Sequence, residues 1–269
     1  MKVITLVIIV FSFSWNCFGF TFNNTVGAAF TQDPVIINVA DNCVNLGVSS
    51  SDLLSITQQA VDQFWNSAPS SRLVLKVGSL VTVSTDYRTQ KICTPSGNSC
   101  DPNTSLTVAE GILIACNTET GTNFTSDAIL GITLPNNING TTLNGSLFLI
   151  NDRATNSFQD KSRSQMASII AHELGHAIGL GHSPVEDSLM YYTLVPVRDR
   201  LGWDDVDGVT YLYPKEQPIG CGTIDTNSSR TNGLFAGLLF ISLIIFMQTY
   251  GLRKENPLTK HSASYSSNQ

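Results

Sequence analysis

Residues 172–182 read HELGHAIGLGH, and this stretch decides how the whole chain is interpreted. On a helix, residues four apart lie on one face, so His172 and His176 can direct their imidazole nitrogens toward one metal ion. His182 lies too far along a continuous helix to join them, so the helix must end and the chain must turn back. Gly179 and Gly181 permit that turn, because glycine readily adopts the positive φ values found at helix ends.

The residue types in this stretch predict a catalytic metal site. Three neutral imidazoles leave the fourth position of a tetrahedral zinc open to water, as in catalytic rather than structural zinc sites. Glu173 directly follows the first ligand and can take a proton from that water. Of the four histidines in the chain, only His261 lies outside the motif, in a polar tail. We therefore expect one Zn²⁺, held by His172, His176 and His182, with Glu173 as the general base.

The extended motif resembles that of the metzincin metallopeptidases. Met190, eight residues after His182, is similar to the methionine that lies beneath the zinc in that group. Ser183 and residues 201–213 resemble the matrixins, the matrix metallopeptidase family, and the resemblance is strong over residues 164–213. It implies a metzincin α/β fold: a twisted, mostly parallel sheet with one antiparallel edge strand, a long helix, an active-site helix and a C-terminal helix. It also implies a metalloendopeptidase that hydrolyses peptide bonds of extracellular proteins.

The chain departs from the matrixin pattern in several places. No histidine precedes residue 172, so the second, structural zinc of the family has no ligands here, and no Pro-Arg-Cys-Gly latch segment is present. Tyr192 matches a tyrosine that the related astacins and serralysins place near the zinc, whereas Tyr191 matches the residue that follows the methionine in matrixins. Either tyrosine could assist the reaction or line a pocket. Calcium is possible by resemblance, without assignable ligands.

The resemblance also implies how a substrate is held. The peptide would add as an extended strand along an edge such as residues 129–134. Residues 191–196 would form the wall of the pocket that follows the cleaved bond. Because several of these residues are apolar, we expect the pocket to favour an apolar side chain.

Composition and charge exclude some partners. Only 13% of the residues are charged, and the formal net charge is −6. Residues 20–232 carry 11 basic and 20 acidic side chains, a balance of −9. Nucleic acids and anionic membrane surfaces attract basic patches, so neither is expected as a partner. We expect a monomer that acts on proteins or peptides.

The two ends of the chain predict an exported protein. Residues 1–19 read as a secretory signal, with a basic start, an apolar run and small residues near the cut, although an uncleaved anchor is the alternative. Residues 233–250 are apolar and long enough to span a membrane, and basic residues follow them, so the catalytic domain would lie outside. A bacterial C-terminal sorting signal is the other interpretation. The predicted parts are a signal (1–19), a metallopeptidase domain (20–218), a linker (219–232), an apolar helix (233–250) and a polar tail (251–269).

The cysteines predict disulfides, because exported proteins form them where geometry allows. Cys93 and Cys100 flank a turn-rich loop and form the first expected pair. Cys43 and Cys116 form the second, which leaves Cys221 over once Cys17 is removed with the signal. The alternative for Cys43 is a thiol latch on the zinc.

Hydrophobic patterns place the remaining elements. We expect a helix over residues 51–67, capped by Ser51 or Asp52, an active-site helix that begins near Ser162 or Ser164, and a last helix capped by Asp204. We expect strands over residues 35–39, 73–83, 111–116, 146–150 and 128–134, the last of these ended by Pro135-Asn136-Asn137.

Two classes of function fit these features. The first is a zinc endopeptidase, with an anchored sheddase or a self-processing surface protein as variants. The second is a surface adhesion or binding module on a zinc-stabilised scaffold. Glu173 distinguishes them, because a purely structural site has no use for a carboxylate beside an open zinc.

Overall fold

The computed structural model describes residues 19–97, 99–193 and 197–215. The predicted signal up to residue 18, the linker, the apolar segment 233–250, the polar tail and Cys221 lie outside the described residues. Contacts between residues divide the chain into two units, Met1–Glu216 and Gln217–Gln269, and all described residues belong to the first unit. Among the helices of this described part, none is both long and apolar enough to cross a membrane.

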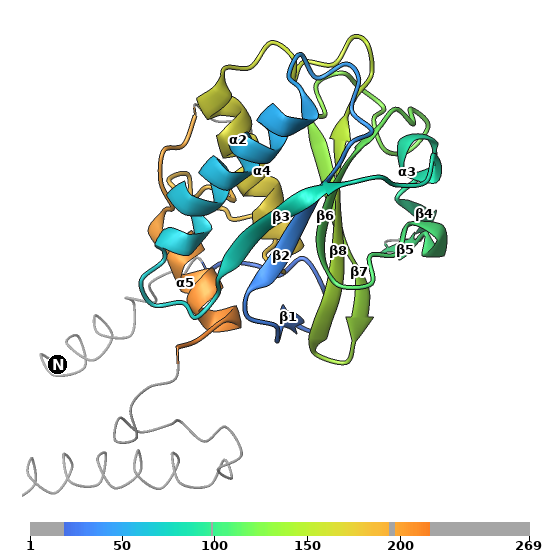
Figure 1. Ribbon diagram of the computed structural model, residues 1–269. Helices are drawn as coiled ribbons and strands as arrows, with labels where there is room; N and C mark the ends of the chain where they lie inside the picture. Colours follow the sequence, from blue (N-terminus) through green and yellow to red (C-terminus); the bar gives the residue numbers. More distant parts are fainter. Residues whose placement is uncertain (1–18, 98, 194–196, 216–269) are drawn as a thin grey trace, which may run out of the picture. The chain divides into compact units, whose positions relative to one another are not determined.

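A six-stranded sheet forms the middle of the domain (Figure 1). Five strands follow the order β1-β8-β6-β2-β3 and pair in parallel, while β7 pairs antiparallel with β8. All seven residues of β6 are buried, as expected for a parallel strand that is covered on both faces. The predicted fold class is confirmed. The strands are β1 (Ala29–Phe30), β2 (Val35–Ala40), β3 (Leu75–Val81), β6 (Gly111–Asn117), β7 (Gly131–Asn139) and β8 (Thr142–Asn151).

The predicted end of the antiparallel strand is wrong. Strand β7 continues through Pro135 to Asn139, with shifts in its pairing register around Asn137. Proline cannot donate a ladder hydrogen bond, but a strand at the edge of a sheet has one side without a partner strand. β7 has only β8 as a neighbour, so this edge position and the local irregularity accommodate Pro135.

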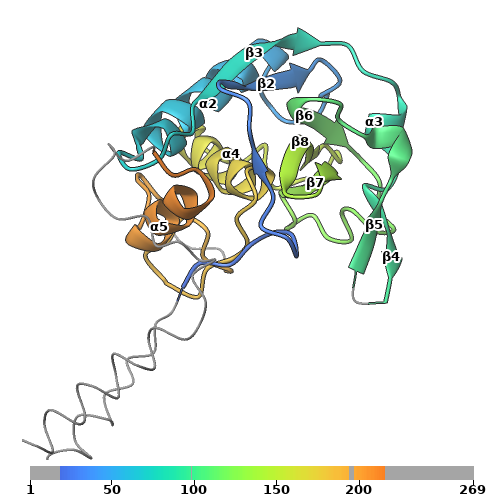
Figure 2. The same ribbon diagram turned by 90° about the horizontal axis from the view of Figure 1, so that it is seen from below.

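Two helices cover one face of the sheet, as Figures 1 and 2 show from two directions. Helix α2 (Ser50–Gln63) packs beside α4 (Arg163–Ala177), and their apolar faces join the sheet in one core. A capping box of Ser49 and Asp52 starts α2, so neither predicted cap residue holds that position. The helix ends at Phe64 and a short 3₁₀ turn, η1 (Trp65–Ser67), replaces its predicted last turn. Helix α4 begins next to Ser162, one of the two predicted starts, and Ser162 is its N-cap.

The last helix, α5 (Trp203–Leu212), does not use the predicted cap. Gly202 is its N-cap, and the carboxylate of Asp205 accepts the Gly202 backbone N–H at 2.8 Å. The acidic residue three positions into the helix therefore satisfies its first turn, as in a capping box, whereas Asp204 already lies inside the helix.

The opposite face of the sheet carries a second apolar cluster and the small elements. The predicted loop between Cys93 and Cys100 is a hairpin, whose strands are joined by a disulfide with a Cα–Cα distance of 5.4 Å. A second disulfide joins Cys43 and Cys116, at 5.1 Å between Cα atoms. Both predicted pairings are confirmed, and Cys43 is therefore not a thiol latch. The small elements are α3 (Asp86–Thr89), β4 (Cys93–Ser96), β5 (Ser99–Pro102) and η2 (Thr104–Leu106).

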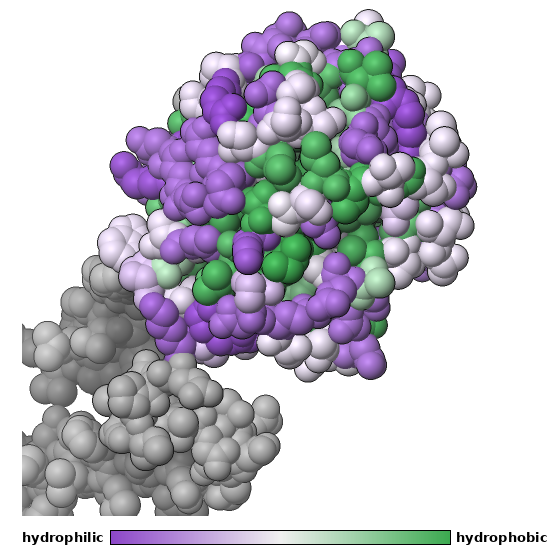
Figure 3. All heavy atoms as spheres, viewed as in Figure 1, coloured by the Kyte–Doolittle hydropathy of each residue, from purple (hydrophilic) through white to green (hydrophobic). Residues whose placement is uncertain are grey.

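Not all apolar surface is covered. On the face seen in Figure 3, hydrophobic side chains gather across the middle of the domain, over the region of β3 and β6 in Figure 1. Ile36 of β2 and Leu80 of β3 are among the exposed large apolar residues. The sheet therefore buries one face under helices and leaves part of the other in contact with solvent.

Candidate metal centre and active site

The fold brings the three histidines of the motif together. His172 and His176 lie one turn apart on α4, which ends at the C-cap residue Ile178. Gly179 then adopts a φ of 109°, and the chain returns so that His182 faces the helix. The possible ligand atoms of the three rings lie within 4.8 Å of one another. Within the described part of the chain, this is the one group of three or more histidine, cysteine or acidic residues so arranged.

The ring nitrogens fit a tetrahedral ion. Zn–N bonds of about 2.0–2.1 Å place two ligand nitrogens about 3.3 Å apart, and the Nε2 atoms of His176 and His182 are 3.2 Å apart. The Nδ1 atoms of His172 and His176 lie 2.7 and 2.9 Å from the carbonyl oxygens of Leu189 and Leu180. A carbonyl only accepts, so Nδ1 carries the proton and Nε2 is free to bind a metal.

The environment keeps the rings of His176 and His182 neutral. Burial lowers the pKa of His176 to about 3, and the neighbouring His172 acts in the same direction. Burial and His172 also lower the pKa of His182. Because imidazole binds metal only when it is not protonated, both shifts prepare the site for a cation.

The N-terminal segment of the domain holds the third histidine in place. The Gly181 N–H donates to the Thr21 carbonyl at 2.7 Å, and the Thr21 hydroxyl donates to the His182 carbonyl at 2.6 Å. A Cβ atom on Gly181 would lie 2.3 Å from Thr21 Oγ1 and 2.8 Å from the Phe22 carbonyl oxygen, so a glycine is needed there. Thr21 has no signal in its own segment that would identify it as part of the site.

Met190 packs against the turn of α4 that carries His172 and His176. Its side chain is buried, and a Cβ atom on Gly175 would lie 2.2 Å from Met190 Sδ. The Met190 carbonyl also accepts the Ser183 N–H at 2.7 Å, next to His182. The glycine between the two helical histidines therefore makes room for the methionine.

Asp205 ties this methionine turn to α5. Its carboxylate accepts the Ser188 hydroxyl at 2.5 Å and the Leu189 and Met190 N–H groups at 2.6 and 3.1 Å. Burial raises the pKa of Asp205, and these hydrogen bonds oppose that rise. The Leu189 carbonyl is hydrogen-bonded to His172 Nδ1, so Asp205 positions the first histidine indirectly, through Leu189.

Glu173 lies against the edge strand β7. Its side chain is only 9% exposed, and the Thr133 hydroxyl donates to Oε2 at 2.7 Å. Burial raises the pKa of Glu173 above its ordinary value, while His172 and the Thr133 hydrogen bond act in the opposite direction. A Cβ atom on Gly131 would lie 3.1 Å from Glu173 Cγ, so the strand passes close to the carboxylate. Sequence reasoning did not identify Thr133.

Two hollows meet at Glu173 and His182. The first has a volume of about 420 Å³ and lies between α4, the start of β7 and the methionine turn. The second, of about 560 Å³, lies between β7 and the N-terminal segment that contains Phe22. Glu173, His182 and Gly131 line both, so a ligand in either hollow would reach the histidine site.

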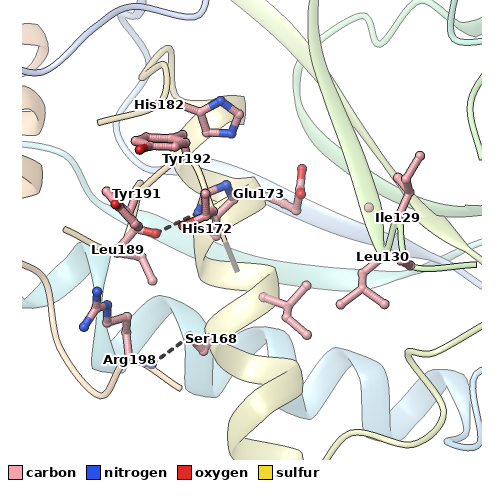
Figure 4. A pocket seen from close by; sticks show the side chains of 14 residues that line it. Ile129, Leu130, Ser168, His172, Glu173, His182, Leu189, Tyr191, Tyr192 and Arg198 are labelled. Carbon is pink, nitrogen blue, oxygen red and sulfur yellow. Dashed lines mark hydrogen bonds between the residues drawn. The ribbon is translucent and has the colours of Figure 1, made fainter. Parts of the chain in front are cut away.

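Both candidate tyrosines line the first hollow. Figure 4 shows Tyr192 beside His182 and Tyr191 nearer to Leu189. Their rings contact each other, with centroids 4.6 Å apart. A hydrogen bond to Tyr192 raises the pKa of Tyr191. A role for either in the reaction stays a prediction.

This fold, with a three-histidine centre beside a buried glutamate, defines the class of metzincin-type metallopeptidase domains. Residues 112–214 match the family described as Matrixin. This part of the chain therefore matches a matrix metallopeptidase-type catalytic domain.

Similar proteins come from a plant and an animal. Metalloendoproteinase 2-MMP of Arabidopsis thaliana is 46% identical over 50 residues, which cover 18% of this chain and 13% of that protein. Metalloendoproteinase 4-MMP of the same plant is 38% identical over 79 residues, covering 27% and 23%. Interstitial collagenase of Sus scrofa is 40% identical over 70 residues, covering 25% and 14%. The chain thus spans less than a quarter of each relative's length.

Proposed function

We propose that this protein is a zinc-dependent endopeptidase that hydrolyses peptide bonds of extracellular proteins, with Glu173 as the general base. The observation that carries the proposal is the position of Glu173. It is a buried carboxylate, adjacent to three convergent histidines, and among the described residues its hydrogen-bond partner is Thr133, at one oxygen. A site that served stability alone would not need such a carboxylate.

His172, His176 and His182 would hold the zinc ion. When bound, zinc would supply a Lewis acid that polarises the scissile carbonyl and lowers the pKa of a water molecule. The carbonyl groups of Leu189 and Leu180 keep two of the imidazole rings oriented through their Nδ1 atoms. Met190 supports the helix from below, and Asp205 fixes the turn that carries it.

Glu173 moves the protons of the reaction. Thr133 occupies Oε2, which leaves Oε1 to accept a proton from the attacking water. Burial raises the pKa of this carboxyl, so it can hold that proton and then deliver it to the departing amine. No covalent intermediate with the enzyme is required.

The edge strand β7 is the proposed docking site for the substrate backbone. It is antiparallel to β8 and has no strand on its other side among the described residues. A peptide could add there as a further strand through main-chain hydrogen bonds. The hollows on the two sides of Glu173 would then receive side chains that flank the cleaved bond, with Tyr191 and Tyr192 along one wall.

The cellular setting is also proposed. A secretory signal over residues 1–19, a catalytic domain over residues 20–218 and a single zinc describe an exported, monomeric enzyme. The two disulfides fit an oxidising compartment. Tethering through residues 233–250 stays a prediction from the sequence, as does any calcium site.

A peptide-library digest tests the function. The full-length protein, loaded with one zinc per chain, is expected to cleave internal bonds, to lose cleavage in a chelator and to regain it when zinc is returned. If the zinc-loaded protein leaves every peptide intact, the endopeptidase proposal is wrong and a binding module on the same scaffold is favoured.

A further inference from the structure

The pocket beside the histidines contains a cation that the mechanism does not use. We infer that Arg198 makes this pocket select a substrate side chain that ends in a carboxylate, such as that of glutamate, next to the cleaved bond. The inference deepens the proposed endopeptidase function and rests on it for the identity of the pocket as a substrate site.

The pocket has apolar walls and one polar end. Ile129 and Leu130 contribute apolar surface, and so do Ile169 and Leu189. Figure 4 shows Arg198 across from Ile129 and Leu130, with Ser168 between them along α4. A side chain that enters beside His172 would therefore pass apolar surface before it reaches Arg198.

The charge of Arg198 has no counterion in the described part of the chain. The ion pairs there join Arg88 to Asp152, Arg153 to Asp127, and Arg200 to Asp199, and none includes Arg198. Nη2 of Arg198 donates to the backbone carbonyl of Glu186, which orients the guanidinium without neutralising it. Its Nε atom is buried and has no hydrogen-bond partner among the described residues.

The Arg198 backbone is also held at the pocket. Its N–H donates to the Ser168 hydroxyl on α4 at 3.3 Å. Ser168 is buried and lines the same pocket, one helical turn before the first histidine. The guanidinium is thus presented from a backbone position anchored to the active-site helix.

Three kinds of substrate side chain would interact differently with the Arg198 guanidinium. A carboxylate on a short apolar stem matches the planar fork of an arginine and supplies the missing charge. A leucine side chain would fill the apolar part but remove water from a guanidinium that has no counterion among the described residues, which is unfavourable. A lysine would bring a second positive charge to the same place. The pocket therefore favours glutamate over leucine, and leucine over lysine.

This preference differs from the apolar one expected from residues 191–196. That expectation considered only the segment after Met190, and Arg198 lies two residues beyond it. The contact that brings Arg198 to the pocket is its hydrogen bond to Ser168, 30 residues earlier in the chain. Spacing within the segment does not reveal such a contact.

Binding of two zinc-directed ligands tests the inference without requiring hydrolysis. The ligands are short peptide hydroxamates with amidated C-termini that differ only in the side chain next to the hydroxamate, carboxyethyl or isobutyl. Dissociation constants are measured by calorimetry on the full-length, zinc-loaded protein. The variants are Arg198→Met, which keeps a long stem without charge, and Arg200→Met, a matched control at an exposed arginine.

The wild type and Arg200→Met are expected to bind the carboxyethyl ligand about tenfold or more tightly than the isobutyl ligand. Arg198→Met should lose this preference. The inference is overturned if the wild type prefers the isobutyl ligand, if Arg198→Met keeps the carboxyethyl preference, or if neither ligand binds while zinc is present. Failure of the proposed function alone would look different: ligands discriminated by Arg198, but no peptide cleaved.

Discussion

Replacement of Asp205 by alanine should both destabilise the domain and weaken metal binding. The side chain is 1% exposed and accepts four hydrogen bonds, from the Ser188 hydroxyl and from the N–H groups of Leu189, Met190 and Gly202. Alanine would leave the buried N–H groups of Leu189 and Gly202 without an acceptor, at about 1–3 kcal/mol each, whereas the Met190 N–H keeps the Ser188 hydroxyl at 2.9 Å. Water can enter the space of the lost carboxylate and satisfy some of them. The expected loss in the free energy of unfolding is therefore about 3–5 kcal/mol.

The effect on the metal follows from the same contacts. When the turn loosens, the Leu189 carbonyl no longer fixes His172, whose Nδ1 it binds at 2.7 Å. Loss of a group that orients a metal ligand typically weakens metal affinity by about 10–100-fold. Asp205→Asn keeps one acceptor oxygen and should fall between wild type and Asp205→Ala in both properties.

Two measurements on the full-length protein check this prediction. Urea unfolding, followed by tryptophan fluorescence in the presence of a chelator, gives the change in stability. Competition with a zinc chromophore gives the metal affinity. Asp207→Ala is the matched control, because Asp207 is exposed on the same helix and should change stability by no more than about 0.5 kcal/mol. If Asp205→Ala unfolds like this control and binds zinc as tightly as wild type, the proposed link between α5 and the metal site is wrong.

Three further substitutions probe other contacts of the site and the fold. Gly175→Ala should lower the free energy of unfolding by about 1–3 kcal/mol, because the added Cβ atom would overlap Met190 Sδ. The double variant with Met190→Ala should recover part of this loss, and strictly additive effects in urea unfolding would contradict the packing. Thr133→Val should lower kcat about tenfold or more with little change in KM, since it removes a hydrogen bond to the charged base. Thr133→Ser keeps the hydroxyl and should retain the rate, and an unchanged kcat for the valine variant would refute a positioning role. Cys43→Ser, which opens a disulfide between residues 73 apart, should lower the free energy of unfolding by about 4 kcal/mol, whereas Cys93→Ser, whose disulfide joins residues 7 apart, should lower it by about 2 kcal/mol. Equal urea midpoints for the two serine variants would contradict this order.

The sequence was sufficient for the parts of the site that depend on local spacing. His172 and His176 follow from helical periodicity, and the return of His182 follows from the glycines between them. Both disulfide pairings were also predicted: Cys93 with Cys100 from the turn-rich loop between them, and Cys43 with Cys116 as the second choice, with Cys221 left over. Met190 came from resemblance, because a lone methionine carries no local signal of its position.

The parts that were missed depend on contacts between distant segments. Thr133 reaches Glu173 across 40 residues, and Thr21 reaches the His182 carbonyl across 161. Neither contact leaves a periodic trace in its own segment. The predicted strand end at Pro135 was wrong because its location at the sheet edge depends on the pairing of β7 with β8 alone. The sequence also did not show that Asp205, rather than Asp204, completes the cap of α5.

The central claim is that Glu173 acts as the base of a one-zinc peptidase centre. The most direct measurement is kcat/KM of Glu173→Ala and of wild type on the same cleaved peptide, with the zinc content of both determined in parallel. The variant should retain one zinc per chain, because the three histidines are unchanged, and should lose activity by about 10²–10⁴-fold. A zinc-loaded variant that cleaves the peptide at the wild-type rate would contradict the claim.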